Sequence, residues 1–136
     1  MNTNHAEAVF AIRTGMNNGL RKINELTPMT LADRLFLDAI KRDHQIHALN
    51  ELLAIYKAPD RSLIDEYMND KTGSETGESE NRTEESAKAH FADYAEDEER
   101  NLNRLLAERE LLMGYINADE RMQIRYNEFR GRFPIL

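Results

Sequence analysis

Residues 31–56 read LADRLFLDAIKRDHQIHALNELLAIY, and this stretch decides the fold because it carries apolar side chains on two sides of one predicted helix. At 100° per residue, the first apolar set falls within one arc of about 100°. That set consists of Leu31, Leu35, Ala39, Ile46, Leu49, Leu53 and Tyr56. The opposite side holds Phe36, Leu37, Ile40, Ala48, Ala54 and Ile55. A surface helix needs only one apolar side, so the pattern predicts either the central helix of the fold or a helix between subunits.

The residues around this stretch predict its ends and the next helix. Thr30 is a good N-cap, and the helix is expected to run over 30–56, before the break at Pro59. Asp60 then supplies the cap of a short helix over 60–69, which has one small apolar side.

A first helix is predicted over 4–26, where Asn4 is followed three residues later by Glu7 as in a capping box. Ala11, Gly15 and Gly19 are spaced four apart, so one flank of this helix is nearly bare. We expect a neighbouring helix to approach closely along that flank. The alternative is a weak or kinked helix, because glycine inside a helix costs about 1 kcal/mol relative to alanine.

Residues 71–85, KTGSETGESENRTEE, contain no Val, Ile, Leu, Met or aromatic residue. Such a segment has little to offset the entropy cost of ordering it, so we predict a disordered acidic linker. A long amphipathic helix, which could form a coiled coil, is predicted over 86–136. Its apolar side rotates after Gly114, which favours a break within 114–119, and its tail is basic and then apolar.

No segment alternates apolar and polar residues with a period of two, so no β-strand is predicted. The expected fold class is all-α, a small helical bundle. It comprises an N-terminal helical region over 1–70, the linker over 71–85 and the C-terminal helix over 86–136. That helix either folds back to complete the bundle or pairs with its copy in another subunit.

Composition excludes several classes of protein. The 136 residues include no cysteine, which rules out disulfides and thiolate metal sites. No apolar run approaches the roughly 18 residues that a bilayer-spanning helix needs, and the N-terminal stretch lacks the basic region of a signal peptide. We therefore expect a cytoplasmic protein. Residues 71–100 carry 10 acidic and 4 basic side chains and so most of the net charge of −7, which opposes general nucleic-acid binding.

Three charged residues interrupt the apolar stripes. Arg42 lies in the middle of the first arc of helix 30–56, and Glu98 and Arg109 lie within the stripe of the C-terminal helix. Burying an arginine without a partner costs several kcal/mol, so each arginine is expected to find a carboxylate or to reach solvent along its stem. Our hypothesis is that pairing between helices fixes their register.

The segment DHQIHALNE, residues 43–51, is the best candidate for a metal site. His44, His47 and Glu51 lie within about 60° of one another on a helix, and divalent metals accept imidazole and carboxylate ligands. The segment lacks the four-residue histidine spacing of helical zinc motifs. The alternative that we favour is a polar belt at a helix or subunit contact, and a third is a pH-sensitive contact.

Another candidate metal site is the acidic pair Glu96 and Glu99. It has the Glu-x-x-Glu spacing with which all-helical nucleotide pyrophosphohydrolases bind Mg²⁺. The spacing is similar to that of this family, but its second acidic motif has no convincing counterpart in this chain. A Mg²⁺ site needs several converging oxygens, which one pair does not supply. We therefore favour a solvated helix side.

The C-terminal tail mixes basic and aromatic residues in a pattern typical of a docking hot spot, and also suited to nucleic acid or an acidic partner. The candidate partner-binding residues are Arg121, Tyr126, Phe129, Arg130, Arg132 and Phe133. We favour protein docking over nucleic acid, because the acidic charge of the whole chain opposes DNA binding.

These observations favour a non-catalytic helical protein that acts through protein–protein interactions, as an assembly factor, adaptor or inhibitor. Small acidic helical proteins of this kind are frequent among bacteriophage accessory proteins. The apolar sides of helix 30–56 indicate a homo-oligomer, and a further protein partner is expected. One alternative is a metal-dependent enzyme or metal-binding protein that uses His44, His47 and Glu51. Another is a nucleic-acid-binding protein or an anti-nuclease protein that mimics DNA.

Overall fold

The computed structural model describes residues 4–69 and 83–135, and every regular element within them is an α-helix. The predicted all-α class is therefore confirmed. In chain order the helices are α1 (His5–Glu25), α2 (Leu31–Lys57), α3 (Arg61–Asn69), α4 (Glu84–Asn117) and α5 (Glu120–Arg132).

The predicted linker over 71–85 lies outside the described residues except for its last three. Those three belong to the start of α4. The Thr83 hydroxyl accepts a hydrogen bond from the backbone N–H of Ser86, and the Ser86 side chain binds the Thr83 backbone in return, which forms a capping box. Glu84 and Glu85 then form the first turn, where negative charge is favourable.

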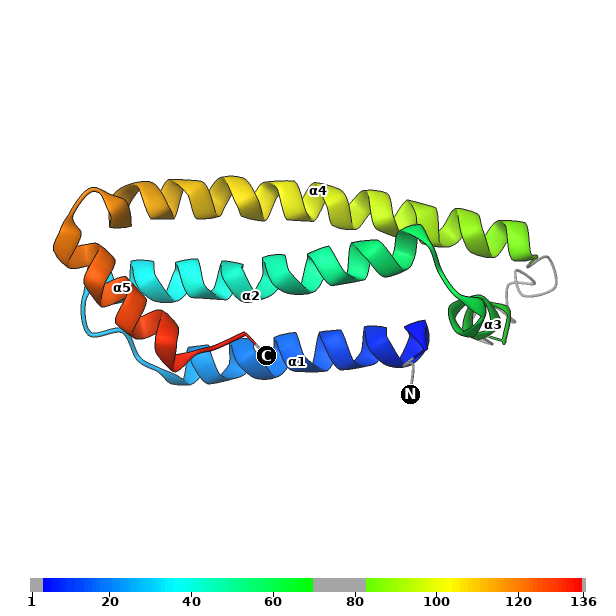
Figure 1. Ribbon diagram of the computed structural model, residues 1–136, viewed down its shortest axis with the longest axis horizontal. Coiled ribbons are helices and arrows are strands. Elements are labelled where there is room, and N and C mark those ends of the chain that lie inside the picture. The colour runs from blue at the N-terminus through cyan, green and yellow to red at the C-terminus, as the bar shows by residue number, and fades with distance from the viewer. Residues whose placement is uncertain (1–3, 70–82, 136) are drawn as a thin grey trace.

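α2 lies in the middle of the bundle, between α1 and α4 (Figure 1), both of which run antiparallel to it. Its two apolar sides face these two helices, so the expectation of a central helix is correct. The alternative, a helix between subunits, is not needed to cover α2, because the same chain covers both of its flanks. This removes the sequence argument for oligomerisation that rested on α2.

The buried side chains form two clusters along the axis of the bundle. One lies towards α3 and joins the second half of α2, including Leu52 and Tyr56, to the first half of α4, including Phe91. The other lies at the opposite end and joins the first half of α2, including Phe36, to Ile116 of α4 and to α5. Burying apolar area in these clusters is the main source of stability for so small a fold.

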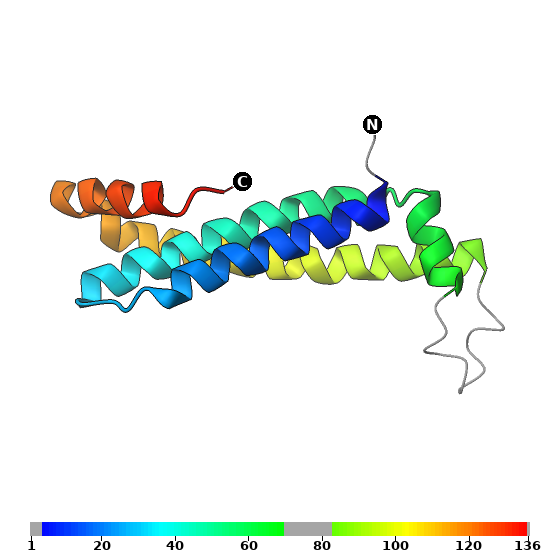
Figure 2. The same ribbon diagram turned by 90° about the horizontal axis from the view of Figure 1, so that it is seen from below.

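The long C-terminal helix is interrupted at Ala118 and Asp119, within the segment where the rotated apolar side favoured a break. Asp119 accepts a hydrogen bond from the backbone N–H of Arg121 and caps α5. α5 then turns back over one side of the layer formed by α1, α2 and α4 (Figure 2). The turn lets the apolar side of α5 face the core even though it is rotated relative to that of α4.

A reciprocal pair of hydrogen bonds ties the start of α1 to the start of α3. The Asp60 carboxylate accepts from the backbone N–H of His5 at 2.8 Å, and the His5 Nδ1 accepts from the backbone N–H of Asp60 at 3.0 Å. Asp60 also caps α3, as predicted, by accepting from the N–H of Leu63. Burial opposes ionisation, but these hydrogen bonds and one from Ser62 outweigh it and lower the pKa of Asp60.

Candidate functional site

His44 is the most buried of the three predicted metal ligands, with 7% of its surface exposed. Its Nε2 lies 3.0 Å from the backbone carbonyl oxygen of Phe133, beyond the end of α5. A carbonyl can only accept a hydrogen bond, so Nε2 must carry the proton and donate. His44 therefore holds the C-terminal segment against α2.

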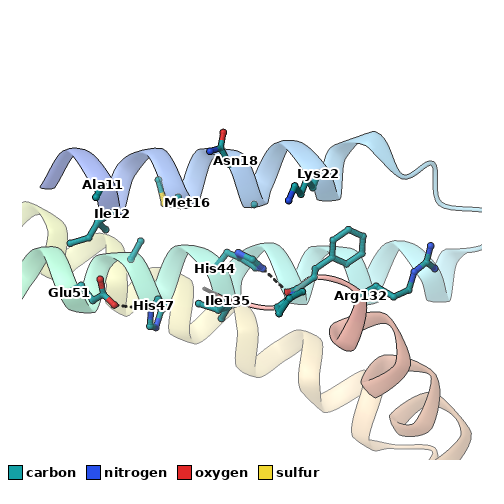
Figure 3. A pocket seen from close by; sticks show the side chains of 15 residues that line it. Ala11, Ile12, Met16, Asn18, Lys22, His44, His47, Glu51, Arg132 and Ile135 are labelled. Carbon is teal, nitrogen blue, oxygen red and sulfur yellow. Dashed lines mark hydrogen bonds and ion pairs between the residues drawn. The ribbon is translucent and has the colours of Figure 1, made fainter. Parts of the chain in front are cut away.

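His47 and Glu51 are directed elsewhere. The His47 Nε2 lies 2.8 Å from a Glu51 carboxylate oxygen, on a half-exposed part of α2. Figure 3 shows His44 reaching towards the C-terminal segment while His47 reaches towards Glu51. The structure thus does not gather the three side chains around one point, and no group of three potential ligands suited to a metal ion occurs within residues 4–69 and 83–135. The polar belt at a helix or subunit contact stays a prediction for these residues.

A cavity of about 280 Å³ lies beside His44, between α1, α2 and the C-terminal segment. Ala11, Gly15 and Gly19 of α1 form one wall, and the expected bare flank has two different roles there. At Gly19, an added Cβ would lie 2.6 Å from the His44 Nδ1, so the helices do approach closely. At Gly15, an added Cβ would meet nothing within 4 Å. The flank of α1 therefore packs against His44 at Gly19 and leaves space at Gly15.

Arg42 and Arg109 each find a carboxylate on the facing helix. Arg42 of α2 pairs with Glu108 of α4, with its Nη2 2.9 Å from the Glu108 carboxylate. Arg109 of α4 pairs with Asp43 of α2. In the first pair the arginine belongs to α2, and in the second it belongs to α4. The two pairs lie next to each other between the two apolar clusters. In an antiparallel pair of helices, a slip by one turn would bring Arg42 opposite either Arg104 or Leu112, so the arrangement is suited to defining register.

Asp43 also links the two ion pairs between α2 and α4 to α5. Its second carboxylate oxygen accepts a hydrogen bond from the Tyr126 hydroxyl at 2.8 Å, and 11% of its side chain is exposed. Burial and this hydrogen bond raise the pKa of Tyr126 to about 12. Burial alone would lower the pKa of Arg109, but the Asp43 carboxylate reverses the effect and raises it. Both shifts favour the protonated forms of Tyr126 and Arg109, in which the phenol and the guanidinium donate to Asp43.

Glu98 does not join the pair formed by Arg109. It is half-buried on α4, and its charge acts on Arg13 of α1, where it helps to raise the pKa after a larger effect of the Tyr56 hydrogen bond. The Arg13 Nη2 donates to the Tyr56 hydroxyl at 2.8 Å. Glu98 thus interrupts the stripe at a position where its charge acts on a side chain of α1.

The predicted partner-binding residues of the tail do not form a single surface. Tyr126 is buried, and Phe129 and Phe133 pack against the apolar cluster that contains Phe36, with a ring separation of 5.5 Å between Phe129 and Phe36. The remaining members, Arg121, Arg130 and Arg132, are exposed. The expectation of one exposed basic and aromatic patch fails for Tyr126, because the alternating pattern is that of an amphipathic helix with its aromatic side turned inward.

Glu96 and Glu99 are exposed on α4, and both line a shallow hollow near the end of α2 together with Lys57 and Lys88. Neither glutamate makes an ion pair within the described part of the chain. Two carboxylates flanked by two ammonium groups are a poor match for a cation that needs several converging oxygens. This agrees with a solvated helix side.

The exposed apolar side chains form the feature that the sequence did not single out. Leu111 and Tyr115 of α4 are 70% and 68% exposed, and Ile124 of α5 is 54% exposed. Met29 and Leu31, at the junction of α1 and α2, are also largely exposed. In the sequence, the apolar side of the predicted C-terminal helix rotates after Gly114, close to both residues. The break at Ala118 separates them from Tyr126 and leaves them facing outward.

No described helix combines the length and apolar character that crossing a bilayer requires. The chain matches no protein-family model, no curated protein and no solved structure.

Proposed function

We propose that this chain is a non-catalytic interaction protein that docks another protein at the end of the bundle where α4 meets α5. The observation that supports this most directly is the outward position of Leu111 and Tyr115, one helical turn apart on α4. Ile124 follows on α5, and the junction of α1 and α2, with Met29 and Leu31, lies at the same end (Figures 1 and 2).

Single exposed apolar residues are ordinary on protein surfaces, whereas several at one end of a small domain are typical of a binding site. Tyrosine is enriched among the residues that contribute most to protein–protein affinity. Exposed charged residues of both signs, among them Glu110, Asp119 and Arg121, lie close to these residues in the sequence, and charged residues are typical of the polar rim of a protein interface. A nucleic-acid surface would instead need clustered positive charge.

A second copy of this chain is the first partner to test, and a heterologous protein is the second. The experiment compares the wild-type chain with the double variant Leu111→Ser/Tyr115→Ser, which removes apolar surface without changing charge. Phe10→Ser is the matched control, because Phe10 is 74% exposed on α1 and lies towards the other end of the bundle. Light scattering after size exclusion measures self-association, and native mass spectrometry of the chain isolated from its host measures bound partners.

We expect the wild type and Phe10→Ser to form the same complex, with a mass above that of one chain, and the double variant to lose it. A wild-type chain that stays a monomer and retains no partner would contradict the proposal. So would a double variant that assembles as well as Phe10→Ser.

A further inference from the structure

The cavity between α1, α2 and the C-terminal segment has the properties of a small-molecule site rather than of a packing gap. Its volume is about 280 Å³, and most of its wall is apolar, from the small residues of α1 on one side to Phe133, Pro134 and Ile135 on the other (Figure 3). A cavity of roughly 150 Å³ accommodates benzene, so this one suits a compound of about ten non-hydrogen atoms.

The glycines of α1 show that close packing of the helices is not the reason for this space. Gly19 is required there, because a Cβ would clash with the His44 ring, which is in turn held by Phe133. Gly15 also lines the cavity, yet a Cβ at this position would meet no atom within 4 Å. Gly15 is exposed at the edge of the cavity, so a longer side chain at this position could extend over the opening without strain.

The charges around the cavity indicate the class of ligand. Lys22 and Arg132 both contribute to its wall, and neither has a carboxylate partner within the residues that the structure describes. The Arg132 guanidinium lies instead over the Phe129 ring, 5.6 Å from its centre. The carboxylate in the wall, Glu51, is already paired with His47. At this end of the cavity, no carboxylate of residues 4–69 and 83–135 pairs with the Lys22 ammonium.

We propose that this cavity binds a small amphipathic anion. Its carboxylate lies at Lys22, in the positive potential to which Arg132 adds, and its apolar body lies along Gly15 and Ile135. Because Phe133 to Ile135 form part of the wall, the bound anion also fixes the C-terminal segment that His44 holds. This inference is independent of the docking surface on α4, and either can fail without the other.

Isothermal titration of the full chain with four probes tests the ligand class. Octanoate has both features, octanol has the apolar body alone, octylamine has the opposite charge, and acetate has the charge alone. We expect octanoate to bind about three- to tenfold more tightly than octanol, and octylamine and acetate to bind more weakly than both. The absence of octanoate binding, or octylamine binding as tightly as octanoate, would overturn the proposal.

Substitutions in the chain test whether the anion binds in this cavity. Gly15→Leu fills the cavity, and Gly114→Leu is its matched control, because Gly114 of α4 also has no atom within 4 Å of an added Cβ. We expect Gly15→Leu to weaken octanoate binding about tenfold or more, with Gly114→Leu unchanged. Lys22→Met should weaken octanoate about threefold and leave octanol unaffected, which keeps the test decisive if Gly15→Leu disturbs α1. Equal octanoate affinities for Gly15→Leu and Gly114→Leu, or for Lys22→Met and the wild type, would show that the cavity is not the site.

Discussion

The two flanks of α2 are packed very differently, although both are covered by the same chain. On the α4 flank, buried side chains occur along the whole interface, from Ala87 to Ile116, and two ion pairs lie between the apolar clusters. On the α1 flank, Ile23 is the one residue of α1 that is buried, and the cavity opens between the helices. Regions with few buried contacts are where local opening and ligand binding occur most easily. Stability is therefore concentrated on the α4 flank, and space for a ligand on the α1 flank.

The sharpest test of this contrast is one substitution made on both flanks. Ile116→Ala on α4 removes a fully buried side chain and should lower the free energy of unfolding by about 2–5 kcal/mol. Ile12→Ala on α1 removes a partly buried side chain that already borders the cavity, so we expect a loss of about 1 kcal/mol. Urea denaturation of both variants measures the difference. Equal losses would show that α1 is as firmly packed as α4.

The ion pairs of the α4 flank should give the next largest effect. Arg109→Leu leaves the largely buried Asp43 with the Tyr126 hydroxyl as its one side-chain partner among the described residues. We expect a loss of about 1–3 kcal/mol in unfolding free energy. The double variant Asp43→Leu/Arg109→Leu should recover part of this loss, because no charge is then left without its partner. If Arg109→Leu unfolds and assembles like the wild type, the pair has no role in holding α2 and α4 in register.

Two glycines of α1 provide a test within the α1 flank, because their replacement by alanine should change stability in opposite directions. Gly15→Ala should raise stability by about 0.5–1 kcal/mol, because alanine is the better helix former and its Cβ meets no neighbour. Gly19→Ala should lower stability by about 1–2 kcal/mol, since its Cβ forces the His44 ring away from the Phe133 carbonyl. Thermal unfolding followed by circular dichroism measures both. Stabilisation by Gly19→Ala would mean that α1 does not pack against His44.

The central position of α2 could be predicted because burial on both sides leaves a visible pattern in the sequence. The pattern shows which residues are buried but not what covers them, and for this reason it could not distinguish α1 and α4 from a second subunit. The same limit applies to Arg42 and Arg109. Their need for carboxylates was predictable, whereas the identity of Glu108 and Asp43 depends on the antiparallel register of helices that are distant in sequence.

The candidate site was less predictable for two physical reasons. The partner of His44 is a backbone carbonyl 89 residues away, and a backbone group has no sequence signature. The spacing of His44, His47 and Glu51 also describes a helix side equally well whether it faces a metal, a neighbouring helix or solvent. The alternating arginines and aromatics of the tail are ambiguous in the same way. An exposed docking surface and an amphipathic helix with Tyr126 turned inward have the same sequence pattern.

The last predicted effect concerns the pH dependence of stability and belongs to the α4 flank. The pKa of Tyr126 is raised from 10.0 to about 12 in the folded chain, so its proton is held more tightly there than in the unfolded chain. Below pH 10 the phenol is neutral in both states, and the stabilising contact with Asp43 is fully present. Between pH 10 and 12 the unfolded phenol ionises first, so stability falls as the pH rises through this window.

Tyr126→Phe removes this titration and should cost about 1 kcal/mol at neutral pH, because one hydrogen bond to Asp43 is lost. The advantage of the wild type over the variant should then shrink between pH 10 and 12, in urea denaturation curves recorded at each pH. Tyr115→Phe, at a largely exposed position, is the control and should follow the wild type throughout. A wild-type advantage that stays constant across this window would mean that the Tyr126 phenol is not held by Asp43, and that the link between α5 and the ion pairs of α2 and α4 is weaker than the geometry indicates.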